Sequence, residues 1–406
     1  MRGFKVSIGR RTSTAPPVLL PPGWPSSLGP LELAMVDLPT PFMALDVDNI
    51  RVACDRLHRA FDEQVEVCFA VKCNPDPVVL KTLADCGANF EIASAPELAM
   101  VVAAGGDPRR VLYSNTVKPA SHIASTRADG VPLFAADSES EVEKIAREAP
   151  GAGVVIRVSV DDTHSRFPLS SKFGVPLDGA VGLLRSAREH GLTPAGLTFH
   201  VGSQCTDATA WGKAITALAP VLLSLTRLGI ELEILDIGGG FPARYDRPVP
   251  PIEEIGRHTL AALDRLPYRP RRIVCEPGRA LVAESAVIAS TVIGREQRHG
   301  TEWVYLDVGA YNGLMESAQT KATWAFPLLT SRLDGTEAQI RATVTGPTCD
   351  SSDTIFFDAP ITADISEGDR VYIGAAGAYT LCYASSFNGF PPPTPVYFDG
   401  SVRLID

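Results

Sequence analysis

The chain has 406 residues, of which 45% are hydrophobic and 21% charged, which is ordinary usage for a globular protein. Its 37 Lys and Arg against 47 Asp and Glu give a net charge of −10, which argues against nucleic acid or an anionic membrane as a partner. No apolar run approaches the ~18 residues of a membrane span. The eight cysteines occur singly, mostly inside apolar runs, which is typical of reduced thiols in a cytoplasmic protein.

The first 40 residues differ from the rest of the chain. Basic residues come first, and a proline-rich segment between Pro16 and Pro25 follows them. Proline fixes φ and removes a backbone donor, so this composition favours an extended arm. We expect residues 1–40 to form such an arm and to lend a strand to a domain further along the chain.

From residue 65 onwards, short runs rich in apolar and β-branched residues recur, as expected for strands covered by helices. The runs are Glu66–Lys72, Asn89–Ser94, Arg110–Asn115, Pro132–Ser138, Gly153–Val160, Gly196–Ser203, Glu231–Gly240 and Arg272–Gly278. The amphipathic stretches between them include Pro77–Cys86, Ala95–Ala104, Ser140–Glu148 and Ala180–His190. This alternation predicts an α/β fold, a (β/α)8 TIM-type barrel over residues 41–280. An open doubly wound sheet is the alternative.

A barrel of this kind gathers its chemistry at the carboxyl ends of its strands. The residues at those ends are Lys72, Glu91, Asn115, Asp137, Arg157, His200, Gly238, Gly239, Gly240 and Glu276. Single members of this set, such as Asp137, and the neighbouring Ser94 also suit a second role, the capping of the next helix. As a set they indicate a site.

Lys72 ends the apolar run that begins at Val67. Burial disfavours the ammonium form and lowers a lysine pKa, which makes Lys72 a candidate Schiff-base nucleophile. The alternative for a lysine at a strand end is a solvated surface residue.

A glycine run, Gly238–Gly240, closes the seventh predicted strand, and Glu276–Arg279 closes the eighth. Consecutive glycines let backbone N–H groups approach an anion, and barrel enzymes often bind phosphate with the loops after these two strands. A phosphate site and a lysine at one barrel edge predict pyridoxal 5′-phosphate (PLP), an aldehyde that carries a phosphate. No GxGxxG motif follows the first strand, so a dinucleotide site is not indicated, and no metal is expected.

Two further strand-end residues suit a PLP site. A carboxylate at Glu276 would keep the pyridine nitrogen protonated, which favours decarboxylation, whereas an arginine there would suit a racemase. His200 would stack on the cofactor ring, or it is a hydrogen-bonded structural residue.

A different pattern follows residue 280, where short strands alternate with turns. The predicted strands are Trp303–Asp307, Ala338–Val344, Arg370–Ile373, Val396–Phe398 and Val402–Ile405. They predict a small all-β domain, a sandwich or barrel, over residues 281–406.

The motifs of the chain match a known family in order. They include FAVKCNPDP, FEIASAPEL, HVGSQ, DIGGGFP, CEPGR, YLDVGAYNGLMES, GPTCDSSD and GAYTLCYASSFNGF. From Pro41 to Tyr397 the chain resembles the ornithine/lysine decarboxylases, PLP enzymes with an alanine-racemase-like barrel (fold type III). The resemblance implies decarboxylation of an amino acid with a polar, cationic side chain to an amine and CO2, as in polyamine biosynthesis.

The resemblance also implies residue roles. Lys72 would form the Schiff base, His200 would stack on the ring, and Glu276 would pair with the pyridine nitrogen. The phosphate would be held by Ser203, Gly238, Gly239, Gly240, Arg279 and Tyr379, with Glu91 and Arg157 supporting the cofactor. Cys349 would return a proton to the carbanion, Asp350 would bind the distal ammonium of the substrate, and Phe387 would line that pocket.

In the family, two subunits pair head to tail, and the motif equivalent to Cys349–Asp350 enters the partner's site. The resemblance therefore implies a homodimer with shared active sites. It also implies a salt bridge across the dimer from Lys172, with Asp353 as its partner.

The chain departs from the family at the distal pocket. A second acidic residue there falls on Thr320, followed by Lys321, when the sequences are counted without gaps; a gap would bring Glu316 into the pocket instead. Two carboxylates hold an ammonium better than one. The departure leaves open diaminopimelate, a D-amino acid or a carrier-linked amino acid as substrate. A catalytically dead regulatory homologue is the alternative from another class.

Overall fold

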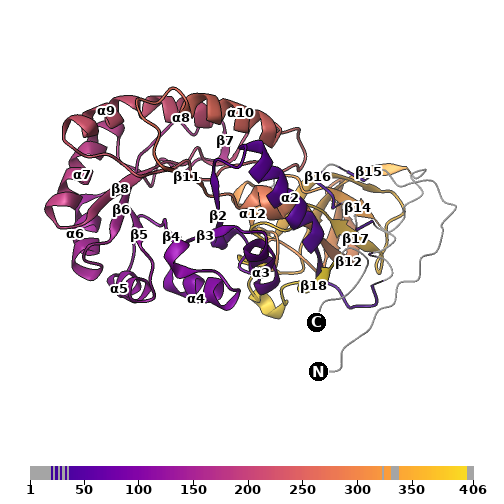
Figure 1. Cartoon of the computed structure of the whole chain (residues 1–406). Coiled ribbons are helices and arrows are strands. Elements are labelled where there is room, and N and C mark those ends of the chain that lie inside the picture. Colours follow the sequence, from indigo (N-terminus) through magenta and orange to yellow (C-terminus); the bar gives the residue numbers. More distant parts are fainter. Residues whose placement is uncertain are drawn as a thin grey trace. The chain divides into compact units, whose positions relative to one another are not determined.

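A computed structural model of the chain describes residues 20–21, 23–25, 28–29, 33, 36–321, 324–330 and 338–399 (Figure 1). Most of the predicted arm and the predicted strand Val402–Ile405 lie outside the described residues. The chain divides into two compact units, each described here by itself. Unit 1 consists of residues 1–50, 243–248 and 281–406, and unit 2 of residues 51–242 and 249–280. No helix of the described ranges is long and apolar enough to cross a membrane.

Unit 2 is a closed barrel of parallel strands in the order β10-β11-β2-β3-β4-β5-β6-β8. These strands are β2 (Glu66–Ala70), β3 (Asn89–Ile92), β4 (Leu112–Tyr113), β5 (Leu133–Ala136), β6 (Gly153–Arg157), β8 (Thr193–Thr198), β10 (Ile234–Asp236) and β11 (Arg272–Cys275). The predicted barrel is therefore confirmed, and closure excludes the open sheet.

Helices follow the barrel strands along the chain and surround them (Figure 1). They are α3 (Pro77–Asp85), α4 (Ala95–Ala103), α5 (Ala120–Ala128), α6 (Glu139–Glu148), α7 (Leu177–Glu189), α8 (Ala210–Ala217), α9 (Ala219–Arg227) and α10 (Ile252–Leu263), after α2 (Val47–Ala60). Local chemistry fixes their starts: Asp76 accepts hydrogen bonds from the first N–H groups of α3, and Ser94 does so for α4. Ser94 is thus a cap, as the alternative for that residue proposed.

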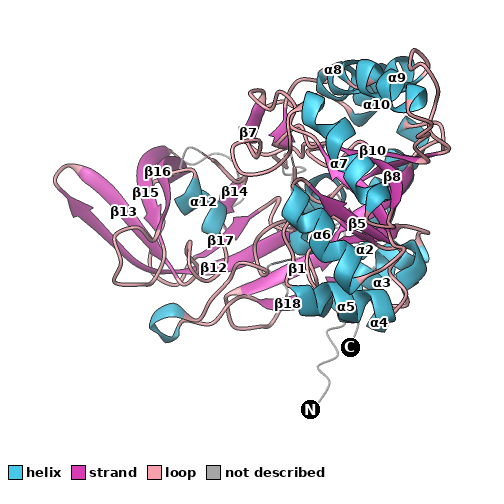
Figure 2. Cartoon of the chain, turned by 90° about the vertical axis from the view of Figure 1, so that its left-hand side faces the viewer, coloured by secondary structure: helices cyan, strands magenta, loops and turns pink. Residues whose placement is uncertain are grey.

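Unit 1 contains an eight-stranded sheet in which β14-β17-β12-β13-β15-β16 form one path (strands magenta in Figure 2). β1 pairs with β12, and β18 pairs with β1. The strands of the sheet are β1 (Phe42–Asp46), β12 (Ala286–Arg298), β13 (Thr301–Leu306), β14 (Leu328–Thr330), β15 (Gln339–Thr345), β16 (Thr354–Thr362), β17 (Arg370–Ile373) and β18 (Thr394–Phe398). Side chains from both ends of the chain, including Phe42, Val287 and Tyr372, form its core.

The first strand of the chain belongs to this sheet. β1 pairs antiparallel with β12 and parallel with β18, so the structure passes from unit 1 to unit 2 after Ile50. The sequence-based boundary between residues 40 and 41 differs from this one because the run Phe42–Asp46 has its hydrogen-bond partners far along the chain.

Candidate active site

Lys72 lies two residues beyond the end of a barrel strand. β2 ends at Ala70, and Val71–Cys73 form a single 3-10 turn. Lys72 therefore lies in this turn and not in the strand, which the sequence-based prediction extended to Lys72. The ammonium of Lys72 forms an ion pair with Glu91. The Lys72 side chain is 45% exposed, whereas that of Glu91 is 2% exposed.

The pKa of Lys72 is raised rather than lowered. Burial acts to lower it, but the nearby carboxyl groups of Glu91 and Glu276 outweigh burial. The expectation of a lowered pKa for Lys72 is therefore wrong. In the ligand-free protein Lys72 is an ammonium held by a carboxylate, and it must lose a proton before it can act as a nucleophile.

The register of the barrel brings Glu91 to Lys72. Ala70 of β2 pairs with Glu91 at the end of β3, which places Glu91 beside the turn that carries the lysine. Burial raises the pKa of Glu91, and the charge of Lys72 opposes that shift. The two residues form an ion pair between a buried carboxylate and a more accessible ammonium at the carboxyl edge of the barrel.

Glu276 follows β11 at the same edge and is almost fully buried. Its pKa is raised to about 8, first by burial and then by the nearby Asp236. The carboxyl group of Asp236 lies beside that of Glu276, and the nearby Ser114 side chain opposes the rise in the Glu276 pKa. Oε1 of Glu276 is buried and has no hydrogen-bond partner among the described residues. A buried carboxyl oxygen in this state is available to a ligand.

Asp236, at the end of β10, is a site residue that sequence reasoning did not single out. Its carboxylate accepts hydrogen bonds from the N–H of Gly238 at 2.9 Å and from the hydroxyl of Thr198 at 2.8 Å. Burial raises its pKa to about 6. Its position in the sequence could have identified it, because Asp236 is an acidic residue that ends an apolar strand and precedes the glycine run.

His200 is a neutral imidazole at the end of the segment after β8. Burial lowers its pKa well below the ordinary value, and the charges of Arg157 and Lys72 act in the same direction. Nδ1 accepts a hydrogen bond from the N–H of Gly202 at 2.9 Å, so the proton of the neutral ring lies on Nε2. This arrangement fixes the ring and leaves its edge and face for other contacts.

The glycine run after β10 lies against its neighbours so closely that side chains do not fit. A Cβ at Gly239 would lie 2.5 Å from the carbonyl oxygen of Glu276 and 3.1 Å from Nε2 of His200. Gly238 has a φ of +64°, and a Cβ there would lie 2.0 Å from the carbonyl oxygen of Phe199. The run therefore exposes backbone beside two predicted site residues.

Two arginines complete the set in unit 2. Nη2 of Arg279 donates to Oγ of Ser203 at 3.4 Å, and the Arg279 guanidinium lies over the ring of Phe167. The guanidinium of Arg157 lies 5.2 Å from the centre of the Phe173 ring. Arg279 and Ser203 thus place a cation and a hydroxyl together, a combination that suits a phosphate.

Asn115 and Asp137 make local contacts instead. The side-chain amide of Asn115 donates to the carbonyl of Val117 at 3.0 Å, and Asp137 accepts from the N–H of Gly174 at 2.9 Å. Both residues therefore shape loops at this edge of the barrel.

The remaining predicted residues lie in unit 1, where Cys349 and Asp350 share an exposed turn. Sγ of Cys349 donates to Oδ1 of Asn388 at 3.3 Å. The carboxylate of Asp350 accepts from the hydroxyl of Tyr311 at 2.8 Å. A backbone N–H and this hydroxyl lower the pKa of Asp350, so it is an anion at neutral pH. The half-exposed ring of Phe387 packs against Tyr311 with 4.9 Å between ring centres.

Thr320 and Tyr379 lie in other segments of unit 1, outside the turn that carries Cys349 and Asp350. Thr320 ends the short helix α12 (Met315–Gln319), and its hydroxyl donates to the carbonyl of Glu316 at 2.8 Å. Tyr379 has a φ of +53°, and its ring is stacked on that of Tyr383. The side chain of Glu316 is buried.

Asp353, the expected partner of Lys172 across the dimer, makes its contacts inside unit 1 in the single subunit. It is fully buried in unit 1, and its carboxylate accepts hydrogen bonds from the N–H groups of Ala310 at 2.7 Å and Thr348 at 3.0 Å. Within one subunit this carboxylate organises its own loops, and the salt bridge from Lys172 across a dimer stays a prediction.

Comparisons with known proteins agree with this geometry. A family profile described as the pyridoxal binding domain of pyridoxal-dependent decarboxylases matches residues 47–283, more than half of the chain. The chain is 35% identical over 350 residues to a probable ornithine decarboxylase of Dictyostelium discoideum, covering 82% of this chain and 74% of the relative. It is 31% identical over 372 residues to the lysine/ornithine decarboxylase of Selenomonas ruminantium, covering 89% and 91%.

A solved structure extends the likeness to three dimensions. The crystal structure of a mutant of the lysine decarboxylase SrLDC in complex with PLP superposes with a TM-score of 0.85 at 30% identity, covering 92% of this chain and 96% of that one. The likeness spans both the barrel and the sheet unit.

The residues at the barrel edge fit PLP. The orphan Oε1 of Glu276 is a partner for a protonated ring nitrogen, and the absence of a side chain at Gly239 lets its backbone lie against the Glu276 loop and the His200 ring. Lys72 supplies the amine that an aldehyde requires. The expectation of a PLP-dependent carboxy-lyase is confirmed. The chain belongs to the family of pyridoxal-dependent decarboxylases that includes the ornithine and lysine/ornithine enzymes.

Proposed function

We propose that this decarboxylase acts on an amino acid with a polar, cationic side chain, similar to ornithine or lysine, and releases CO2 and an amine. The observation that carries the proposal is Glu276, a buried acid with an unused oxygen at the barrel edge that also carries Lys72. A carboxyl group at the ring nitrogen favours loss of CO2, because it keeps that nitrogen protonated.

In this proposal the residues of unit 2 hold the cofactor. Lys72 would bind its aldehyde carbon, His200 would lie on the ring face, and Glu276 would hold the ring nitrogen. The phosphate would be bound by Ser203, Gly238, Gly239, Gly240 and Arg279, joined by Tyr379 of unit 1. Glu91 would accept the proton that Lys72 must lose, a role that its ion pair with Lys72 supports. Arg157 would support the cofactor through its position beside Glu276 and Glu91.

PLP supplies an electron sink for the pair of electrons that remains at Cα when CO2 leaves. Glu276 keeps the proton on the ring nitrogen, so the sink stays available. Cys349 would then return a proton to Cα from its thiol, and its exposed position in a turn supports this role.

The substrate side chain would meet Asp350. This carboxylate is ionised and carries the Tyr311 hydroxyl, with the Phe387 ring beside that tyrosine. Counted without gaps, Thr320 falls where the family has a second acid, and its hydroxyl is bonded to its own helix. With a gap, Glu316 would take that position instead. Diaminopimelate, D-amino acids and carrier-linked amino acids therefore belong in the substrate panel.

We also propose a cytoplasmic homodimer in which each turn that bears Cys349 and Asp350 completes the site of the other subunit. The free thiol state of all eight cysteines supports a reducing compartment. The exposure of Cys349 and Phe387 supports the shared site, because both lie on the surface of their own subunit.

The test combines absorbance with CO2 release. Wild-type protein with added PLP should develop a visible absorption band that disappears on borohydride reduction, and Lys72→Ala should lack it. Lys81→Ala, an exposed lysine paired with Asp85 on α3, is the matched control and should behave as wild type. CO2 release is then measured on L- and D-ornithine, L- and D-lysine and diaminopimelate.

Two results would contradict the proposal. A wild-type protein that develops no band would exclude the site at Lys72. CO2 release from diaminopimelate alone would exclude a substrate with a simple cationic side chain.

A further inference from the structure

Ser203, which is proposed to bind the phosphate, belongs to a small ribbon of two strands outside the barrel ladder. β7 (Ser165–Phe167) pairs antiparallel with β9 (Ser203–Cys205), and the two strands form a sheet of their own. In this register Phe167 lies opposite Ser203. Part of the segment that follows β6 is thus held beside the segment that carries Ser203.

The ribbon packs closely against the glycine run. The N–H of Cys205 in β9 donates to the carbonyl of Gly240 at 2.9 Å. A Cβ at Gly240 would lie 2.5 Å from the carbonyl oxygen of Gly202, and a Cβ at Gly202, where φ is +82°, would lie 2.1 Å from Oγ of Ser165. β7 therefore contacts the residue before β9, which in turn contacts the glycine run. Side chains of β7 lie next to the proposed phosphate site.

Asp162 fixes the chain on both sides of β7. Its carboxylate accepts hydrogen bonds from the N–H groups of Leu169 at 2.6 Å and Ser170 at 2.8 Å. Its backbone carbonyl accepts from the N–H of Ser165 at 3.1 Å and from the Ser165 hydroxyl at 2.7 Å. The position of Phe167 is therefore set by contacts before it, after it and across the ribbon.

Phe167 brings an aromatic ring to Arg279. The guanidinium carbon of Arg279 lies over that ring, 5.7 Å from its centre, and Arg279 is 3% exposed. The face of an aromatic ring attracts a cation, and the attraction is stronger where water is excluded. Nη2 of the same guanidinium donates to Oγ of Ser203 at 3.4 Å. The guanidinium is thus held by a ring and by a hydroxyl from facing residues of one ribbon.

We propose that Phe167 is a positioning residue for the cofactor phosphate: its ring holds the Arg279 guanidinium beside Ser203, so that both groups bind the same phosphate. The inference rests on the proposed role of Arg279 and Ser203. A side chain that orients a ligand-binding group changes ligand affinity without touching the ligand. Phe167 therefore affects the binding of the phosphate and not that of the ring or the aldehyde.

The experiment compares two ligands of the cofactor-free protein: PLP, and pyridoxal, which is the same aldehyde without the phosphate. Phe167→Leu keeps an apolar side chain and removes the ring, whereas Phe167→Tyr keeps the ring. We expect Phe167→Leu to weaken PLP binding roughly three- to tenfold and to leave pyridoxal binding unchanged. Phe167→Tyr should bind PLP as the wild type does. Absorbance titration measures both affinities.

A double-mutant cycle connects the effect to the arginine. Arg279→Met removes the cation and should itself weaken PLP binding. If Phe167 acts through Arg279, adding Phe167→Leu to Arg279→Met should weaken PLP binding no further.

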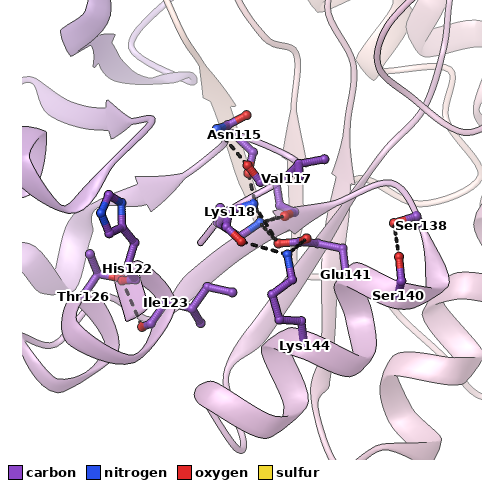
Figure 3. A network of polar contacts seen from close by, with 11 residues as sticks. Asn115, Val117, Lys118, His122, Ile123, Thr126, Ser138, Ser140, Glu141 and Lys144 are labelled. Atoms are coloured by element: carbon purple, nitrogen blue, oxygen red, sulfur yellow. Dashed lines mark hydrogen bonds and ion pairs between the residues drawn. The ribbon is translucent and has the colours of Figure 1, made fainter. Parts of the chain in front are cut away.

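Two control variants separate positioning from a general loss of stability. Phe173→Leu removes another ring of the same loop, which lies 5.2 Å from the guanidinium of Arg157. Lys144→Met weakens unit 2 at α6, because Lys144 contacts Glu141 and the carbonyl of Lys118 (Figure 3). Both variants should keep the ratio of PLP affinity to pyridoxal affinity at its wild-type value.

Four outcomes would overturn the inference: an unchanged PLP affinity in folded Phe167→Leu, an equal loss for PLP and pyridoxal, additive effects in the cycle, or the same change of the ratio in a control variant. If Phe167→Leu does not fold, Phe167→Met replaces it and is judged by the same comparison. A wild type that binds PLP no more tightly than pyridoxal would instead refute the proposed phosphate site. A wild type that binds neither ligand would refute the proposed function.

Discussion

The buried pair of Glu276 and Asp236 shows how the barrel prepares an acid before any ligand arrives. Two neighbouring buried carboxyl groups do not both ionise easily. Burial and the charge of Asp236 raise the pKa of Glu276 to about 8, and burial raises that of Asp236 to about 6. At neutral pH Glu276 then carries the proton that a ring nitrogen shares with it. The protein therefore holds this proton on the Glu276 carboxyl group before the cofactor binds.

This raised pKa makes the stability of the cofactor-free protein dependent on pH. The folded state keeps the Glu276 proton up to about pH 8, whereas an unfolded chain releases it near 4.5. Folding therefore binds a proton in this window, and the contribution is fully present below pH 4.5 and is lost as pH rises. Relative to Glu276→Gln, the wild type should lose about 1.4 kcal/mol of unfolding free energy per pH unit in that range.

The measurement is the thermal denaturation of both cofactor-free proteins between pH 5 and pH 8. Glu253→Gln is the control, because Glu253 is exposed and its partner Arg56 lowers its pKa. The stability of Glu253→Gln should change with pH in the same way as that of the wild type between pH 5 and pH 8. A constant difference between wild type and Glu276→Gln would show that Glu276 is ionised throughout.

For single residues, the sequence predicted which side chains belong to the site better than it predicted their protonation and burial. Lys72 and Glu276 were found from their places at strand ends, because a barrel collects its strand ends at one edge. The raised pKa of Lys72 was not predictable, since it depends on Glu91 and Glu276, which are distant in sequence. The buried state of Asp353 escaped for the same reason, because its partners lie in another loop.

Among the elements, the glycine run after β10 has the strictest steric requirement. Gly239→Ala would place a Cβ 2.5 Å from the backbone oxygen of Glu276, which cannot rotate away as a side chain can. We expect a loss of about 1–3 kcal/mol in stability and weaker PLP binding, because the run and the Glu276 loop must move apart.

Gly182→Ala in α7 is the control for that substitution. A Cβ at Gly182 meets nothing within 4 Å, so alanine should raise stability by about 0.5–1 kcal/mol. Thermal denaturation and PLP titration check both variants. Equal stability of the two variants would mean that the run tolerates side chains.

Strand prediction succeeded where the run of apolar residues was continuous and failed where polar residues, proline or a register shift interrupted it. All eight barrel strands overlap predicted runs, because each is buried on both faces and so is continuously apolar. In unit 1, β12 was missed, and its register shifts between Val292 and Gly294. β16 contains Asp358 and Pro360, which argue against a strand, and β14 is only three residues long.

At the scale of the whole molecule, the predicted residues fall into two sets, one in each unit. Apart from Tyr379, the cofactor set, with Lys72, lies in unit 2, and Cys349 and Asp350 lie in unit 1. If sites are shared between subunits, Lys72→Ala and Cys349→Ala damage different halves of each site. A mixed dimer then contains one intact site.

Mixing the two variants in equal amounts should therefore restore about a quarter of wild-type CO2 release, since half of the dimers are mixed and each has one good site. Assay of the separate variants and of the mixture, after subunit exchange verified by differential tags, checks this. A mixture no more active than the average of its components would exclude sharing.

The pairing of β1 with β18 has a consequence for how the chain is made. The barrel draws its strands from residues 66–275, so its last strand is synthesised well before the ribosome reaches residue 394. Among the strands that the structure describes, β1 is made first, yet one of its two neighbours, β18, is made last. During translation the barrel can therefore close while β1 still waits for a partner some 350 residues downstream.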